Sequence, residues 1–139
     1  MSDEARPLPA PAPAVSPEAK PYWDATAEGR LLLQRCSDCE TVLWYPRGFC
    51  PSCSSVRLEW FEATGRGTVY SYTVIRRGAA PPYAGGEPYV LAYVELDEGP
   101  RVMTNIVDCD PESVSVGDAV QAVFHDTGEG SALVRFRPA

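Results

Sequence analysis

CSDCETVLWYPRGFCPSC, residues 36–53, decides the fold of this chain, because it holds four of the five cysteines as two C-x-x-C pairs ten residues apart. Each pair can form a tight turn that directs two thiolates at one point, and two such turns complete a tetrahedral site of four sulfurs. A single C-x-x-C would leave thioredoxin-like redox chemistry open, whereas the paired arrangement favours a structural metal. The predicted ligands are Cys36, Cys39, Cys50 and Cys53.

Zinc is the expected metal, because four thiolates form a closed tetrahedral shell around it. Iron in a rubredoxin-like site has the same geometry and stays open as an alternative. A closed shell leaves no position for water or substrate, so the predicted role of the metal is to hold a segment that has too little apolar area to fold alone.

The composition is that of a small globular protein. With 139 residues, 45% of them hydrophobic and 22% charged, the chain fits one ordinary domain or two very small ones. No apolar run approaches the ~20 residues that span a bilayer, and MSDEARPLPAPAPAV lacks the basic and apolar regions of a secretory signal. We therefore expect a cytoplasmic protein without a membrane partner, whose thiols stay reduced and form no disulfides.

The charge of the chain argues against nucleic acid as a partner. The formal net charge is -7, and residues 61–139 carry eleven acidic and six basic side chains. A surface that binds polyanions needs a basic patch, so a protein partner or a small ligand is favoured. A nucleic-acid-binding barrel remains the alternative from another class. Its aromatic and basic cluster would be Tyr70, Tyr72, Arg76 and Arg77.

Proline and glycine divide the chain into three parts. Six prolines fall within the first 21 residues, and PLPAPAPA predicts a disordered tail over residues 1–20, with a docking peptide as the alternative. Residues 21–62 are expected to hold a helix and the cysteine-bearing segment, and residues 63–139 the second domain. Pro21 suits the first turn of a helix that Gly29 would end. Such a short helix must pack its aromatic residues on this chain's own core or on a partner.

Strands are expected on either side of the cysteines and throughout the second domain. β-forming residues and short turns predict strands at residues 31–35, 41–46, 56–62, 65–77, 89–96, 101–108, 118–126 and 131–138. Five of these follow Gly65 without a long helix among them, which predicts a small, closed or partly open antiparallel barrel.

Catalytic groups are not predicted anywhere in the chain. Cys109 is interpreted as a bystander thiol, and the single histidine, His125, lies in no motif that would suggest a catalytic dyad. The sequence contains no phosphate-binding loop, dinucleotide fingerprint or nucleophile elbow. An enzyme acting by itself is therefore the least favoured class.

Taken in order, these parts resemble a family that pairs an N-terminal helix and a rubredoxin-like zinc ribbon with a C-terminal OB-fold barrel. The resemblance runs from about residue 21 to 138. It rests on YWDATAEGRLLLQRCSDCE, on CPSC preceded by YPRGF, on EWFEATGRGTVYSYTVI and on PPYAGGEPYVLAYVELDEGPRVMTNIVDCDPESVSVGDAV. The cysteine spacing is common to many zinc ribbons, and the tandem order is the more specific mark.

The resemblance implies a non-catalytic accessory subunit. Members of the family accompany thiolase-superfamily enzymes that act on acyl-CoA thioesters. The implied partner is a thiolase or a thiolase-like aldolase in a hetero-oligomer built on a thiolase dimer, with acyl-CoA bound mainly by the partner. Relatives in sterol degraders pair with aldolases that cleave steroid or bile-acid side chains by a retro-aldol reaction. The alternative implied role is that of a scaffold in a thiolase complex.

Two surfaces are predicted to bind that partner. The helix at residues 21–29 offers Tyr22 and Trp23, because an exposed aromatic pair would make a good anchor. The loop at residues 78–88 comes second, with Tyr83 and Tyr89 at its edges, since it could reach toward the partner's substrate entrance.

Overall fold

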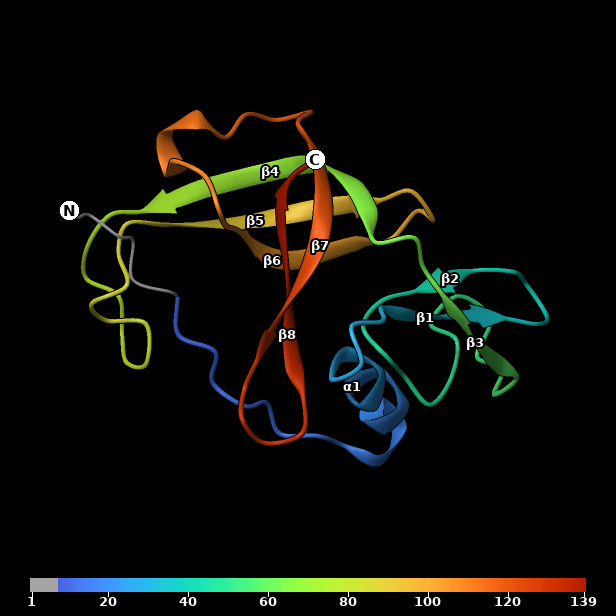
Figure 1. Cartoon of the computed structure of the whole chain (residues 1–139). Helices are drawn as coiled ribbons and strands as arrows, with labels where there is room; N and C mark the ends of the chain where they lie inside the picture. The colour runs from blue at the N-terminus through green and yellow to red at the C-terminus, as the bar shows by residue number, and fades with distance from the viewer. Residues whose placement is uncertain (1–7) are drawn as a thin grey trace.

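Two β-sheets and a short helix make up the chain in the computed structural model, which describes residues 8–139. A three-stranded sheet carries the cysteines, a closed five-stranded barrel forms the second part, and the helix lies between them (Figure 1). This arrangement confirms the predicted fold class. Among the described residues, no helix has the length and apolar character needed to cross a membrane.

The cysteine-bearing sheet is antiparallel, with β1 at its centre. β1 (Leu32–Cys36) pairs with β2 (Val42–Leu43) on one side and with β3 (Leu58–Glu62) on the other. β2 is shorter than the strand predicted at residues 41–46, because Trp44 and Tyr45 pack their rings with the aromatic residues of the helix.

The barrel closes in the order β4-β5-β6-β8-β7. Its strands are β4 (Arg66–Ile75), β5 (Tyr89–Leu96), β6 (Arg101–Ile106), β7 (Ala119–Asp126) and β8 (Ala132–Pro138). Four of the five pairings are antiparallel, as expected. The pairing of β6 with β8 is parallel, because the chain crosses between them through η2 (Pro111–Ser113) and β7.

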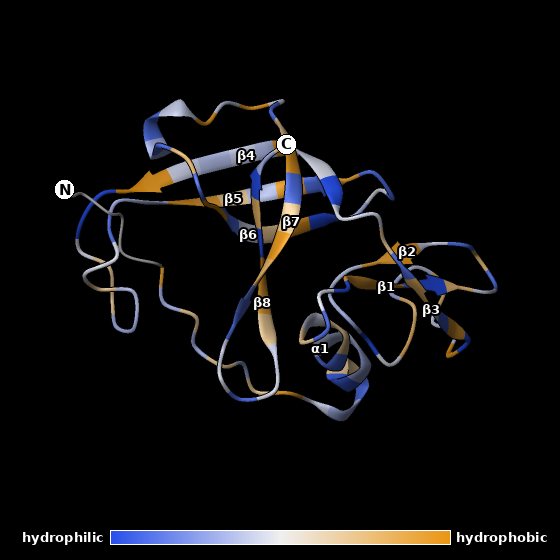
Figure 2. Ribbon diagram, in the orientation of Figure 1, coloured by the Kyte–Doolittle hydropathy of each residue, from blue (hydrophilic) through white to orange (hydrophobic). Residues whose placement is uncertain are grey.

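Alternating side chains along the strands fill the barrel. On β5, Val90, Ala92 and Val94 are buried, whereas Leu91 and Tyr93 point outward and stay exposed. This period of two follows from the pleat of a strand. Figure 2 shows the resulting mixture of apolar and polar segments along the barrel strands. The barrel interior is therefore a packed core.

A short helical segment packs between the two sheets. It consists of η1 (Pro17–Ala19) and α1 (Lys20–Thr26), so the helical turns begin inside the segment that was predicted to be a disordered tail. α1 ends three residues before Gly29, which was expected to stop it. Gly29 adopts a φ of +75°, and the Arg30 N–H donates to the Ala25 carbonyl at 3.0 Å. This left-handed turn is one that glycine adopts at little cost.

Thr26 fastens this helix to the last barrel strand. Its buried hydroxyl donates to the Trp23 carbonyl at 2.6 Å and accepts from the Ala132 N–H at 3.0 Å. Residues 8–16 precede the helix without regular structure and run beneath the barrel toward it (Figure 1). Residues 1–7 of the predicted tail lie outside the described residues, and the domain boundaries at residues 20 and 62 remain predictions.

Gly67 marks the closest approach between β4 and β5. A Cβ atom built there would lie 2.5 Å from the Glu95 carbonyl oxygen and 2.7 Å from Val94 Cγ1. We expect Gly67→Ala to lower the free energy of unfolding by about 1–3 kcal/mol, because the strands must move apart. Urea denaturation measures this. Gly48→Ala is the matched control, since nothing lies within 4 Å of its Cβ position. Equal midpoints for the two variants would contradict the expectation.

Candidate metal centre and aromatic pocket

The four predicted ligands come together at one end of the three-stranded sheet. Their sulfur atoms all lie within 4.8 Å of one another, and two of the separations, Cys36 to Cys53 and Cys39 to Cys50, are 3.6 Å. A zinc ion bound tetrahedrally at about 2.3 Å from each sulfur requires sulfur–sulfur distances of about 3.8 Å. The donor set and its spacing therefore fit a zinc ion.

Two equivalent turns place these thiols. In the first, the Glu40 N–H donates to the Cys36 carbonyl at 2.8 Å, and in the second the Ser54 N–H donates to the Cys50 carbonyl at 2.8 Å. Glu40 and Ser54 both have left-handed backbones, with φ of 66° and 67°. Each C-x-x-C thus forms the same tight turn, and the two turns present their sulfurs to a common centre.

Hydrogen bonds prepare one of the thiols to bind a metal. The Thr41 hydroxyl lies 3.1 Å from the Cys39 sulfur, and hydrogen bonds from the Thr41 side chain and backbone lower the pKa of Cys39 to about 6. A metal ligand must be a thiolate, so this direction favours the metal-binding form of Cys39 at neutral pH. Gln34 braces the loop between the two turns, because its amide both donates to and accepts from the backbone of Arg47.

The centre is structural in character. Four sulfurs complete the coordination of zinc and leave no position for a substrate. Cys109 takes no part, since it lies outside this cluster, and burial raises the pKa of its thiol. Within residues 8–139 this is the only cluster of cysteine, histidine or acidic side chains close enough to hold a metal.

An aromatic cluster joins the helix to the segment that follows β2. The Trp23 indole N–H donates to the Tyr45 hydroxyl at 2.7 Å, and the Trp44 indole N–H donates to the Tyr22 hydroxyl at 3.2 Å. Burial raises the pKa of Tyr22 to about 12. Tyr22 and Trp23 are only 2% and 8% exposed. The premise that they form an exposed pair is therefore wrong, because the helix packs them on this chain's own core.

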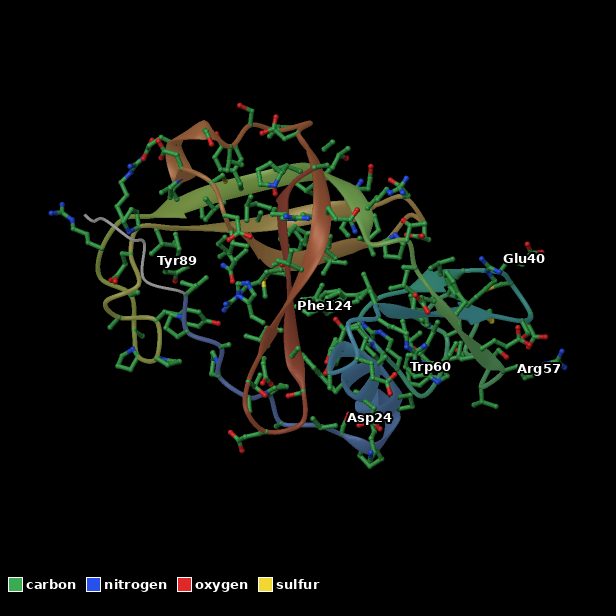
Figure 3. All side chains as sticks on the ribbon, viewed as in Figure 1. Asp24, Glu40, Arg57, Trp60, Tyr89 and Phe124 are labelled. Carbon is green, nitrogen blue, oxygen red and sulfur yellow. The ribbon has the colours of Figure 1, made fainter. Side chains whose placement is uncertain are left out.

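A pocket of about 380 Å³ opens where this cluster meets the barrel. All four residues predicted to bind the partner line it, namely Tyr22, Trp23, Tyr83 and Tyr89. Tyr83 and Tyr89 are half-buried, and their ring centroids lie 5.6 Å apart. Figure 3 shows Tyr89 at the side of the barrel away from Arg57 and Glu40, which mark the outer end of the ribbon. The assignment of these residues to partner binding stays a prediction.

Outward-facing apolar side chains continue from the pocket across the barrel. We call Tyr70, Leu91, Tyr93 and Met103 the outer face; each is between 37% and 54% exposed. Tyr93 lies directly opposite Met103 in the β5–β6 register. The predictions missed this face. The signal was present in YVLAYVEL, whose outward positions 91 and 93 are a leucine and a tyrosine where a solvated strand face would carry polar residues.

Acidic partners neutralise two basic side chains of the barrel, Arg76 and Arg101. Arg76 forms an ion pair with Glu112. Arg101 stacks 3.8 Å above the centroid of the Tyr70 ring and lies 3.2 Å from a Glu95 carboxylate oxygen. A phosphate-binding surface needs cations free to meet phosphates, so these pairs disfavour the nucleic-acid alternative.

Two family models match successive parts of the chain. Residues 23–59 match a domain described as the ChsH2 rubredoxin-like zinc ribbon, and residues 60–125 match one described as the ChsH2 C-terminal OB-fold. These matches confirm the resemblance drawn from the sequence, the zinc ribbon included. The matched domain is a zinc ribbon, and the four cysteines of this chain lie close together. These two findings confirm zinc as the predicted cofactor.

Relatives with similar sequences are named as subunits and scaffolds. A "DUF35 domain-containing scaffold protein" of Methanothermobacter thermautotrophicus is 41% identical over 96 residues, which cover 68% of this chain and 71% of that protein. A solved structure titled "Ltp2-ChsH2(DUF35) aldolase" contains a chain that is 35% identical, with a TM-score of 0.80 over 91% of this chain and 98% of that one.

Two further relatives are much longer than this chain. A "Probable enoyl-CoA hydratase alpha subunit" of Thermomonospora curvata is 38% identical over 130 residues, which cover 93% of this chain and 40% of that protein. A "3-oxo-4,17-pregnadiene-20-carboxyl-CoA hydratase alpha subunit" of Mycobacterium tuberculosis is 31% identical over 121 residues, covering 82% of this chain and 36% of that protein. This chain therefore spans well under half the length of both relatives.

Proposed function

This chain belongs to the DUF35 family of proteins that join a ChsH2-type zinc ribbon to an OB-fold, and from that membership we propose that it is an accessory subunit of a thiolase-like enzyme. It binds and stabilises the enzyme, and the enzyme supplies the catalytic groups. The partner acts on acyl-CoA thioesters and holds the acyl-CoA, in a hetero-oligomer built on a dimer of the enzyme.

One observation carries the proposal, namely the likeness to a subunit of an aldolase. The similar chain matches this fold over 98% of its length, and the name of that structure pairs it with a second component, Ltp2. The likeness includes both the ribbon and the barrel, so it extends to the relative placement of the two parts. A chain with this arrangement can present the same surfaces to a partner.

The outer face gives such a partner something to bind. Its aromatic and methionine side chains are of the types enriched at protein interfaces. Leu91 and Met103 belong both to the outer face and to the lining of the aromatic pocket, so the two features form one continuous surface. We assign this combined surface to the partner. Tyr83 and Tyr89 at the pocket rim are then the predicted partner-binding residues best placed to reach it.

The proposed reaction of the complex is retro-aldol cleavage of a steroid or bile-acid side chain carried as a CoA thioester. The names of two similar proteins support this assignment, one by the word aldolase and the other by a steroid-derived acyl-CoA. In such a reaction the partner breaks a carbon–carbon bond of the thioester. The ribbon holds the accessory subunit together, and the barrel completes the assembly.

A scaffold for a thiolase complex is the second candidate. The name of the Methanothermobacter relative favours it, because that protein matches 68% of this chain and is called a scaffold. The two candidates differ in one measurable respect. An aldolase subunit needs a single enzyme partner, whereas a scaffold holds two different enzymes together.

Purification from the native host under mild conditions tests the proposal. The intact assembly is weighed by light scattering, and its components are identified by mass spectrometry. We expect one thiolase-like enzyme in stoichiometric amount, followed by retro-aldol activity toward acyl-CoA substrates. Two enzymes in one assembly would favour the scaffold. A lone, metal-loaded monomer across salt concentrations would contradict both candidates.

A further inference from the structure

Arg135 is a buried cation without an acidic partner. Its side chain lies on β8 and is 1% exposed, yet among the described residues it forms no ion pair with a carboxylate. A buried charge is costly unless hydrogen bonds replace the water that it loses. The groups that accept hydrogen bonds from Arg135 therefore stabilise its charge in the buried position.

Backbone carbonyls of the N-terminal segment are the main acceptors. One terminal nitrogen of Arg135 donates to the Leu8 carbonyl at 3.1 Å, and the other donates to the Pro9 carbonyl. The first nitrogen also lies 2.9 Å from His125 Nδ1. Burial first, and the charge of Arg135 second, lower the pKa of His125. Its imidazole is therefore neutral at pH 7, and Nδ1 can accept the hydrogen bond.

The loop at residues 78–88 holds the other side of this segment. A Cβ atom built on Gly86 would lie 3.2 Å from Pro9 Cδ and 3.3 Å from Leu8 Cδ1, so both residues pack closely on the glycine backbone. Glu87 stiffens the same loop, because its carboxylate accepts from the N–H groups of Ala79 and Gly85. The segment is thus held between the loop and β8.

The chemistry of the segment matches the site. Alternating prolines favour an extended polyproline conformation, whose carbonyls have no partners within the segment. Proline also lacks an N–H, so such a segment offers acceptors and few donors. A guanidinium carries donors only, and glycine permits the close approach that bulky proline rings require. Extended proline-rich segments lose little conformational entropy on binding.

We propose that Arg135, His125 and Gly86 form a binding site for an extended proline-rich peptide, occupied here by Leu8 and Pro9 of the chain itself. We call residues 8–15, LPAPAPAV, the strap. The strap packs on the loop at residues 78–88. When the strap is bound in this site, it therefore fixes that loop and the half-buried Tyr83 at the rim of the aromatic pocket. The site is independent of the identity of any partner enzyme.

Hydrogen exchange of the full-length chain, measured by mass spectrometry, tests this site. Leu8→Gly/Pro9→Gly keeps every carbonyl but removes the ring and side-chain contacts with Gly86 and loosens the segment. We expect the amides of residues 79–86 to exchange at least ten times faster. Ala14→Gly/Val15→Gly, at exposed positions of the same strap, is the matched control and should leave this exchange unchanged.

A free peptide, LPAPAPAV, then provides the rescue. At millimolar concentration it should return the loop of the Leu8→Gly/Pro9→Gly variant to within twofold of its native exchange rate, whereas GSGSGSGS should not. Arg135→Gln should lose both protection and rescue, and Arg137→Gln, exposed on the same strand, should retain protection. The proposal is overturned if LPAPAPAV gives no rescue, or if the Leu8→Gly/Pro9→Gly variant exchanges like its control.

Discussion

Replacing Cys36 with serine is expected to release the metal and to unfold the ribbon over residues 31–60. Cys36 is buried, ends β1 and supplies one of four sulfurs. Structural zinc contributes about 10–16 kcal/mol to the folding of isolated zinc-finger peptides at pH 7, whereas a whole domain is stable by only about 5–15 kcal/mol. A small sheet with a two-residue strand β2 cannot replace that contribution by apolar burial.

Metal content and hydrogen exchange together measure this effect. Elemental analysis of the purified protein should find one zinc per native chain and less than a tenth of that in the variant. Exchange should rise by orders of magnitude within residues 31–60 and much less within the barrel strands. Cys109→Ser is the matched control, because that thiol lies outside the metal cluster. Retained metal with unchanged exchange in the ribbon would refute a structural role.

Met103→Glu is expected to weaken binding to the partner enzyme at least 100-fold. Met103 is 54% exposed on the outer face, opposite Tyr93. A carboxylate there would be buried without a counter-charge when the surface is covered, and 100-fold corresponds to about 2.7 kcal/mol. The variant itself should remain as stable as the native chain to within ~0.5 kcal/mol, because the position is open to water.

The binding constant is measured by calorimetry against the enzyme identified from the native complex. Val56→Glu serves as the matched control, since Val56 is 77% exposed, more than any other large apolar side chain of residues 8–139, and lies on the ribbon outside the outer face. A native dissociation constant for Met103→Glu would remove the outer face from the interface. Equal weakening by both variants would place the interface on a wider surface that includes the ribbon.

Local patterns predicted most of the fold. The spacing of the cysteines determines the two turns directly, because each turn closes through a hydrogen bond between the first cysteine and the residue that follows the second. The nearly continuous apolar run over residues 89–96 predicted β5 to the residue. In contrast, the six-residue strand expected at residues 41–46 shrank to two, because the rings of Trp44 and Tyr45 gain more from the helix than from the sheet. Tertiary packing overrode local propensity there.

Long-range contacts explain what the sequence left undetermined. Arg135 looks like a solvated residue in SALVRFRP, yet it is buried because the strap, more than 120 residues earlier, covers it. Likewise, an aromatic residue in a short helix can face its own core or a partner. The hydrogen bonds of Trp23 with Tyr45 and of Tyr22 with Trp44 show that these two residues face the chain's own core. Pair contacts of this separation leave no periodic signal in a single sequence.

The parallel pairing of β6 with β8 has a consequence for how the chain acquires its structure during synthesis. β8 lies between β6 and β7 and also receives the helix through the bond from Ala132 to Thr26. The ribbon closes through contacts local in sequence and can form around zinc while the barrel is still emerging from the ribosome. The barrel cannot close, and its first strands stay exposed, until residues 132–138 have been made. During that interval a chaperone or the partner enzyme would bind the exposed strands.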